Sequence, residues 1–308
     1  MRKLISLFFL FVFWSCKKDV NPGSIRLTRT EARDYHDSTL FSDYQYDNQG
    51  RIISISEQRN TGTLKIAVTV SYNGNEVIMQ SNPATDPFYT LDKTVHLTLG
   101  TDGRLIKKTT YVHRVLVNPV IIGPPEGFFT DTSYFNYDNA GLLSSSFRSG
   151  LDSSYTSPDT YSLWRFTYSI NYTNSGNNLT ASEDSFAYNR NNIINGVSQH
   201  TAGNIVSQTV YGYTRAFPNK IDFRNAAVLS EYWLDYFSFV TPLSEMYRNQ
   251  PDQINVITTE WDAAGTYNNT YRSTTDLGRT YNGSGFLSAI NVLTNTTAYR
   301  KINFIYNR

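Results

Sequence analysis

Hydrophobic and polar residues alternate along most of this chain, in short segments that end at Asn, Asp or Gly. A period of two residues is typical of a β-strand that buries one of its faces. In the segment 44–53, Tyr46 and Asp47 precede Gly50, and Ile52 follows it. Asp or Asn opens such a turn by bonding to its own backbone, and Gly accepts the positive φ that closes it. The pattern therefore predicts β-hairpins.

The same order of Tyr, Asp or Asn, Gly and an aliphatic residue recurs along the chain, and its first two tyrosines lie 26 residues apart. We expect an all-β fold, an antiparallel meander of repeated β-hairpins in an extended or rolled sheet. In each hairpin the Tyr before the turn should pair with the aliphatic residue after it. The alternative is an ordinary all-β protein with frequent turns. The copies lie at 44–53, 70–77, 97–106 and 135–143, with weaker ones at 172–179 and 281–287.

One segment departs from this alternation. Between Asn225 and Tyr247 the apolar residues recur at intervals of three to four, which is the period of a helix. The spacing predicts one short helix near 226–239, ended before Pro242. We expect this helix to cover one end or one face of the sheet by core packing, and a binding element is the alternative. Its apolar positions are Val228, Leu229, Trp233, Tyr236, Phe237 and Val240.

Composition supports the β interpretation and excludes several classes of protein. The chain has 23 Tyr and 18 Phe but only 17% charged residues, and aromatic residues suit a half-buried pleated surface. Its 27 basic and 26 acidic residues leave no positive field of the kind that binds nucleic acid, so we expect no nucleic-acid partner. With a single cysteine, the chain can form no disulfide within itself and no cysteine-based metal site.

That cysteine, Cys16, stands at the end of a secretion signal. Arg2 and Lys3 form a basic region, an apolar run of 11 residues follows from Leu4 to Trp14, and Ser15 comes just before the cysteine. The run is too short to cross a bilayer, which requires roughly 20 residues. This order predicts a bacterial lipoprotein signal that is cleaved after Ser15, with a diacylglyceryl group on the sulfur of Cys16. Plain secretion and an uncleaved anchor are the alternatives.

The signal divides the chain into a signal peptide at 1–15, a lipidated cysteine and tether at 16–24, and a single β-rich domain at 25–308. Several acyl chains, among them palmitate, would hold the protein stably on a membrane, whereas one chain holds only marginally. Because Lys17 rather than Asp follows the cysteine, we expect the outer membrane, on either its periplasmic face or the cell surface.

The sequence contains no convincing set of catalytic or metal-binding residues. The histidines His36, His96, His113 and His200 lack metal-ligand spacing, although His96 and His113 could approach each other across a sheet. No nucleophile elbow, phosphate loop or dinucleotide motif is present. We therefore expect no catalytic residues, no metal and no cofactor. The acidic residues Glu231, Asp235, Glu245, Glu260 and Asp262 could supply a glycosidase pair, but solvated charges on the faces of elements explain them better.

Aromatic residues are the remaining candidates for binding. Exposed rings could stack on the apolar face of a sugar, and cross-strand packing is the alternative. We select Trp233, Trp261 and Tyr236 as speculative ligand-binding residues. Further candidates are Tyr155, Tyr161, Trp164, Tyr267 and Tyr271.

The hairpin motif resembles the tyrosine-aspartate repeats of Rhs-type proteins. It is also similar to a group of lipid-anchored Bacteroidota proteins of unknown function, which combine a lipoprotein signal, such hairpins and a characteristic carboxy-terminal stretch. Here that stretch runs from Tyr211-Gly212-Tyr213 through Phe217-Pro218-Asn219 to Gln250-Pro251-Asp252. The resemblance implies a β-rich fold and brings no catalytic residues with it.

Together these observations predict a lipid-anchored protein of the cell envelope that acts as a non-catalytic structural or interaction module. The alternative is an accessory lipoprotein that binds a glycan or a peptide at the surface, and a hydrolase with an unrecognised site is a third possibility. The expected partners are the membrane, through acylated Cys16, and a glycan or an envelope protein.

Overall fold

The structure, a computed structural model, describes most of the chain after the tether. The described residues are 26–33, 38–82, 84–85, 89–116, 126–157, 159–176, 178–212, 225–234, 252–262, 264, 266–283, 286–294 and 298–307. Cys16 and the predicted tether lie outside them.

The described residues form strands and one helix, α1 (Ala226–Leu234). The helix begins where the sequence predicts it, and residues 235–239 of the predicted helix lie outside the described part of the chain. The strands are β1 (Leu27–Arg33), β2 (Thr39–Tyr46), β3 (Ile52–Arg59), β4 (Lys65–Asn73), β5 (Glu76–Ser81), β6 (Ala84–Thr85), β7 (Tyr89–Leu99), β8 (Leu105–Leu116), β9 (Glu126–Tyr137), β10 (Leu143–Ser157), β11 (Thr160–Ser175), β12 (Asn178–Ile194), β13 (Val197–Gly212), β14 (Gln253–Asp262), β15 (Tyr267–Tyr281), β16 (Leu287–Thr294) and β17 (Ala298–Tyr306).

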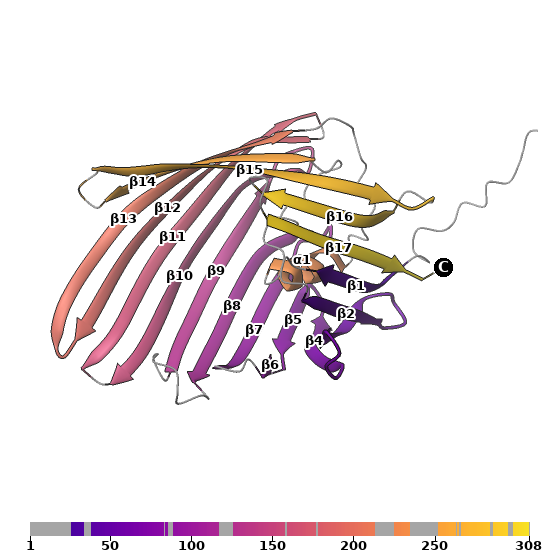
Figure 1. Ribbon diagram of the computed structural model, residues 1–308, viewed down its shortest axis with the longest axis horizontal. Coiled ribbons are helices and arrows are strands. Elements are labelled where there is room, and N and C mark those ends of the chain that lie inside the picture. The colour runs from indigo at the N-terminus through magenta and orange to yellow at the C-terminus, as the bar shows by residue number, and fades with distance from the viewer. Residues whose placement is uncertain are drawn as a thin grey trace, which may run out of the picture.

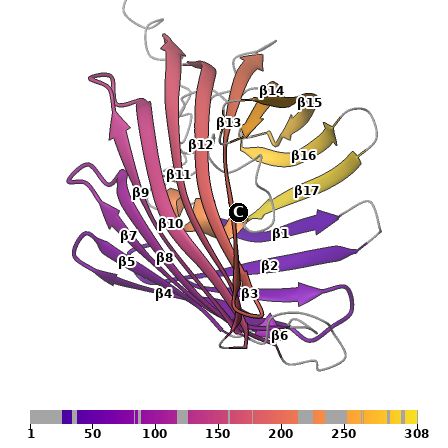
Figure 2. The same ribbon diagram turned by 90° about the vertical axis from the view of Figure 1, so that its left-hand side faces the viewer.

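The strands close into an antiparallel barrel (Figures 1 and 2). Each strand pairs with its neighbours in chain order, and β1 also pairs with β17, with Thr30 opposite Phe304. Sixteen strands make the ring, while the two-residue β6 pairs only with β7. The predicted extended or rolled sheet is therefore wrong. An open sheet leaves two edges of unpaired backbone groups, and pairing β1 with β17 removes both.

The repeated motif forms hairpins at one end of the barrel, which we call the turn end. The predicted cross-strand pairs are confirmed, since Tyr46 lies opposite Ile52 and Tyr137 lies opposite Leu143. In the first turn, Asp47 Oδ1 accepts hydrogen bonds from the backbone of Gln49 and Arg51, and Gly50 adopts a φ of 79°.

Three of the motif tyrosines, Tyr46, Tyr72 and Tyr137, also join their hairpins to the preceding strand. Tyr72 donates its hydroxyl proton to the carbonyl of Ile52 at 2.9 Å, and the guanidinium of Arg51 lies over its ring at 4.4 Å. Tyr137 bonds to Leu105 beneath Arg104 in the same way. Burial raises the pKa of Tyr72 to about 12, so its hydroxyl stays protonated and able to donate at neutral pH.

Apolar side chains point into the barrel and form a core at the turn end. Ile52, Leu97, Leu143 and Ile302 are almost fully buried there. Helix α1 lies between the walls of the barrel in both views (Figures 1 and 2), and its Val228, Leu229 and Tyr232 belong to the same core. The predicted core-packing role of the helix is confirmed for this part of it.

The outer face of the barrel is polar and charged. Residues opposite each other across a ladder share a face, and residues next to inward ones point outward. On β15, Leu277 is buried in the core while its neighbour Asp276 is exposed outside, as is Arg272. On β1 and β2, Arg29 and Asp43 form an outward ion pair with Nε–Oδ1 at 2.5 Å.

The strands differ greatly in length. β1 has 7 residues and β5 has 6, whereas β11 has 16 and β12 has 17. Strands β9 to β13 therefore form a tall wall on the left of Figure 1, extending past the short strands that surround α1. The end of the barrel where β10 meets β11 and β12 meets β13, opposite the turn end, is here called the far end.

Candidate functional site

The inner face of the tall wall carries a cluster of aromatic rings, which we call the inner aromatic wall. Its members come from β9, β11 and β12. Neighbouring ring centroids lie 5.6 to 6.3 Å apart, within the range of attractive aromatic contacts. Trp164 contacts both Phe166 and Phe186. The six residues are Phe129, Trp164, Phe166, Tyr168, Phe186 and Tyr188.

Two inward glycines make room for these rings. A Cβ placed on Gly150 would lie 2.5 Å from Cζ of Phe166, and one placed on Gly203 would lie 2.8 Å from the hydroxyl of Tyr188. Each glycine sits directly opposite the residue whose ring covers it. The rings of Phe166 and Tyr188 therefore lie flat along the wall, whereas Trp164 is inclined to its neighbours, by 77° to Phe186.

Planar charged side chains flank the rings. Arg148 forms an ion pair with Asp131, and its guanidinium lies 5.3 Å from the ring centre of Phe166 and 5.7 Å from that of Phe129. Arg114 forms an ion pair with Asp152, which lies opposite Trp164. Both arginines already have a carboxylate partner, so the wall presents hydrogen-bonding groups without a strong field of either sign.

Exposure increases along the wall toward the far end. Phe166 is buried, Trp164 is half-buried, and Arg190, opposite Trp164, is exposed. Arg190 donates hydrogen bonds to Ser162 Oγ at 3.2 Å and to Asn192 Oδ1 at 3.0 Å. Polar side chains thus form a rim above the aromatic rings.

Deeper in the wall the polar groups are buried. Tyr168 donates a hydrogen bond of 3.0 Å to Asp184 Oδ2. Burial raises the pKa of Asp184 despite this bond and the one from Ser182. Burial also raises the pKa of Tyr168, so its hydroxyl remains a donor.

Polar contacts at three positions hold helix α1 inside the barrel. At its start, the side chain of Asn225 accepts from the amide of Ile52 at 2.7 Å and donates to the carbonyl of Gly50 at 3.0 Å. Farther along, Tyr232 donates to Ser42 Oγ at 2.6 Å and also lies 2.9 Å from Glu57 Oε1. Within the described residues, no helix has both the length and the apolar character needed to cross a bilayer.

Glu231 forms the third contact. It is only 5% exposed and lies between Lys93 at 3.1 Å and Lys108 at 2.9 Å. Burial alone would raise the pKa of Glu231, but the two ammonium groups, Lys108 first, outweigh burial and hold it below its ordinary value. The expectation that Glu231 is a solvated charge on a helix face is therefore wrong. The sequence around Glu231 gives no indication that lysines from two distant strands, Lys93 and Lys108, will face it.

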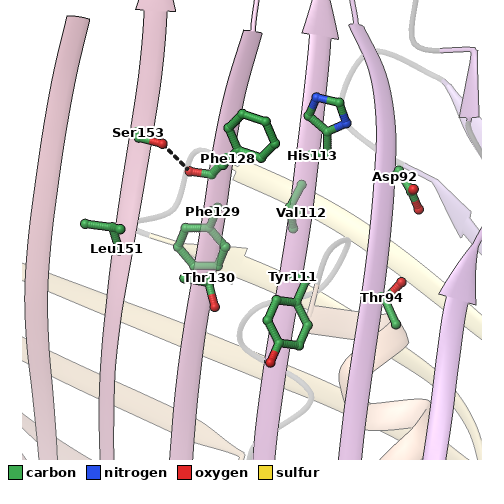
Figure 3. A pocket seen from close by; sticks show the side chains of 10 residues that line it. All are labelled: Asp92, Thr94, Tyr111, Val112, His113, Phe128, Phe129, Thr130, Leu151 and Ser153. Carbon is green, nitrogen blue, oxygen red and sulfur yellow. Dashed lines mark hydrogen bonds between the residues drawn. The ribbon is translucent and has the colours of Figure 1, made fainter.

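A shallow pocket of about 230 Å³ lies on the outer face of the barrel, over β7 to β10 (Figure 3). His113 stacks on Phe128 with ring centres 4.5 Å apart, and its Nε2 lies 2.8 Å from Glu126 Oε1. Ser153 donates to the backbone carbonyl of Phe128 beneath these rings. The remaining lining residues are Asp92, Thr94, Tyr111, Val112, Phe129, Thr130 and Leu151.

Exposed rings continue around this pocket. We call them the outer aromatic patch: Tyr111, Phe128, Tyr134, Phe147 and Tyr155, all on β8 to β10. Serine and threonine separate them on the same face, with Ser149 opposite Thr132. These five rings lie on three neighbouring strands, and single exposed apolar side chains occur farther around the outer face, among them Val210 on β13, Ile257 on β14 and Ile305 on β17.

Of the predicted binding residues, Trp261 and helix α1, which contains Trp233, lie on opposite sides of the barrel wall. Trp261 is half-buried on the outer face of β14, opposite Asn204 on β13. Trp233 belongs to helix α1, inside the barrel. Tyr236, Cys16 and Asp235 lie outside the described residues.

The two histidines that could have met across a sheet do not face each other. His96 lies opposite Thr109, and His113 lies opposite Asp92. Among the described residues, no three His, Cys, Asp or Glu side chains are placed to hold a metal ion.

From the sequence, Trp164 is predicted only as one of several exposed rings, and its neighbours on the inner aromatic wall are not predicted as binding residues. The available signal was aromatic residues at alternate positions, Trp164, Phe166 and Tyr168 on one strand and Phe186 and Tyr188 on the next. A period of two places each set on one face, but which face cannot be decided until the barrel closes.

Comparison with known proteins supports the fold. No protein-family model matches the chain, and no curated protein matches it. A porin-like protein from Bacteroides vulgatus is similar in structure, with a TM-score of 0.51 and 15% sequence identity over 91% of this chain and 98% of that one. A porin-like protein from Bacteroides uniformis has a TM-score of 0.45 and 12% identity over the same shares of both chains. The resemblances to Rhs repeats and to Bacteroidota lipoproteins remain predictions.

Proposed function

We propose that this protein is a lipid-anchored, non-catalytic binding protein of the outer membrane, whose barrel stands in water beside the bilayer. The observation that carries the proposal is which side chains face into the barrel and which face outward. Its apolar side chains point inward, whereas Arg272, Asp276 and Arg165 lie on the outer face of long strands.

A barrel that crosses a membrane has the opposite pattern. It presents an apolar band about 25 Å tall to lipid, and each Arg or Lys facing lipid near the midplane costs about 2–4 kcal/mol. Here the outward charges occur on both sides of the ring, on β1 and β2 as well as on β11 and β15. The outer aromatic patch on β8 to β10 and single exposed apolar residues such as Ile257 and Ile305 interrupt this surface, but charged side chains lie among them, with Ile257 directly opposite Arg272.

The anchor and a structural neighbour support an envelope location. The signal that ends at Cys16 supplies a means of attachment that needs no membrane-crossing strand. A protein of similar fold from Bacteroides vulgatus is named porin-like. Helix α1 lies in the interior that a pore of this strand number would use for transport.

The replacement Cys16→Ser tests the anchor and the location of the barrel together. Because the acyl chains are the only proposed attachment, we expect the variant in the soluble fraction with the far-ultraviolet circular dichroism of the wild type. The wild type should remain with membranes after a carbonate wash and be extracted by detergent.

The replacement Thr69→Ala, on the exposed outer face of β4, is the matched control and should fractionate as the wild type does. A Cys16→Ser protein that is folded but still resists carbonate extraction would show that the protein is held by its strands or by an uncleaved signal rather than by acyl chains, and the proposal would be abandoned.

A further inference from the structure

We infer that the inner aromatic wall binds a neutral oligosaccharide, which enters the barrel from the far end. The inference deepens the proposed function by naming a ligand class. The proposed binding depends on the proposed function in one respect, namely that the far end of the barrel is open to water. Its starting point is a row of ring faces that the protein leaves half-exposed inside the barrel.

The first observation is the state of the rings. An aromatic residue that serves only to fill a core is buried, as Ile52 and Leu97 are at the turn end. Trp164, Phe186 and Tyr188 are instead half-buried although they face inward. Gly150 and Gly203 let the rings of Phe166 and Tyr188 lie flat, whereas the ring of Trp164 is inclined by 48° to Phe166 and by 77° to Phe186. Tyr188 therefore offers a ring face to the interior, and Trp164 stands at an angle beside it. Flat apolar faces match the apolar face of a pyranose ring.

The second observation is the arrangement of polar groups. The Arg114–Asp152 pair lies beside Trp164, and Arg190 lies across from Trp164 on β12. Planar guanidinium and carboxylate groups offer several donors and acceptors in fixed directions. The hydroxyl groups at the edge of a sugar require partners of this kind at the edge of the ring that stacks on it.

The same polar groups argue against other ligands. An acyl chain laid along the wall would remove these charged pairs from water without bonding to them, which costs free energy. Deeper in the wall an ionic ligand would need an uncompensated charge, yet Arg148 and Arg114 are already paired with Asp131 and Asp152. Arg190, which bonds to neutral side chains, lies at the exposed rim rather than beside the deeper rings. A neutral ligand with an apolar face and hydroxyl edges is the class that satisfies both observations.

The direction of entry follows from the gradient of exposure. Helix α1 fills the interior at the turn end, where its Asn225 bonds to the turn after β2. The polar rim of Arg190, Ser162 and Asn192 lies at the far end, next to the most exposed side chains. A linear ligand would therefore meet the rim first, then Trp164, and then the deeper rings along β11.

Titration calorimetry of the full-length protein tests the inference, with linear hexasaccharides of α-1,4-glucose, β-1,4-glucose, β-1,4-mannose, β-1,4-xylose and β-1,4-galactose as probes. Sodium laurate and a neutral decapeptide serve as probes of other classes. We expect at least one hexasaccharide to bind, and Trp164→Ala to weaken that binding about tenfold or more, as truncation of a central aromatic contact does.

Two further variants separate binding from folding. Trp261→Ala removes the tryptophan on the outer face and should leave affinity unchanged. Trp164→Phe retains a ring and should restore most of the affinity that Trp164→Ala loses, with circular dichroism showing all three proteins folded.

Failure of every hexasaccharide to bind, binding of laurate or the peptide alone, or equal losses in Trp164→Ala and Trp261→Ala would each overturn the inference. Binding is measured with purified protein, so these outcomes are independent of the fractionation of Cys16→Ser.

Discussion

The replacement Glu231→Gln is expected to lower the free energy of unfolding by about 3–5 kcal/mol, the range for removing one partner of a buried ion pair. The carboxylate is 5% exposed and bridges Lys93 on β7 and Lys108 on β8. Glutamine keeps the size of the side chain but removes the negative charge that the two buried ammonium groups face. Denaturation in urea, followed by circular dichroism, measures the loss.

The effect should depend on pH in a defined direction. The two lysines hold the pKa of Glu231 below its ordinary value of 4.5. The folded state therefore binds fewer protons at Glu231 than the unfolded state does. The contribution of Glu231 to the free energy of unfolding is complete at pH values above 4.5, the pKa of the unfolded state. The contribution is lost as the pH falls through the lower folded pKa. The difference in stability between wild type and Glu231→Gln should accordingly be constant near neutral pH and shrink on acidification.

An outward ion pair supplies the control. Asp43→Asn breaks the Arg29–Asp43 pair on the outer face, where both side chains contact water. Exposed pairs contribute about 0–1 kcal/mol, so this variant should unfold nearly as the wild type does. Equal losses in the two variants would show that Glu231 is not the buried link between the helix and the barrel.

Gly150→Val is expected to destabilise the barrel by about 3 kcal/mol, the upper part of the usual range for overpacking. The new Cβ would meet Phe166 Cζ at 2.5 Å and the backbone carbonyl of Thr130 at 2.7 Å. The carbonyl belongs to a strand ladder and cannot move aside, so the ring and the strand must both shift. Loss of near-ultraviolet circular dichroism from the aromatic residues, together with a lower urea midpoint, would record this change.

Gly278→Val is the matched control, because it is also a glycine within a long strand. It lies on the outer face of β15, where a Cβ would have no atom nearer than 3.7 Å. Valine suits a strand better than glycine, so the variant should be as stable as the wild type or slightly more stable. A Gly150→Val protein with unchanged stability and aromatic spectrum would contradict the packing of the inner aromatic wall.

The local structure of this protein could be predicted from its sequence, because turn chemistry is local. Asp47 and Gly50 specify their turn within five residues, and the register that pairs Tyr46 with Ile52 follows from it. The start of helix α1 could be predicted for the same reason. Closure of the barrel could not be predicted, because the pairing of β1 with β17 joins residues 268 to 279 positions apart and leaves no periodic signal.

The inner aromatic wall could not be predicted either, because its position depends on how the barrel closes. Alternation shows that Trp164 and Phe166 share a face, but only the closed barrel makes that face the interior. Likewise, the partners of Glu231 lie on strands more than 120 residues earlier in the chain. Residues chosen for their aromatic character alone, such as Trp261, therefore proved to lie on a different face from the cluster.

The link between a motif tyrosine and the preceding strand bears on how such a barrel changes size. Tyr72 beneath Arg51 and Tyr137 beneath Arg104 repeat one contact, in which a hairpin recognises only the arginine and carbonyl of the strand before it. The hairpin at 44–53 carries both halves of this contact, Tyr46 and Arg51, so a duplicate of it would bring both along. Gene duplication or loss could therefore alter the circumference of the barrel two strands at a time, and with it the width of the interior, without requiring a new interface.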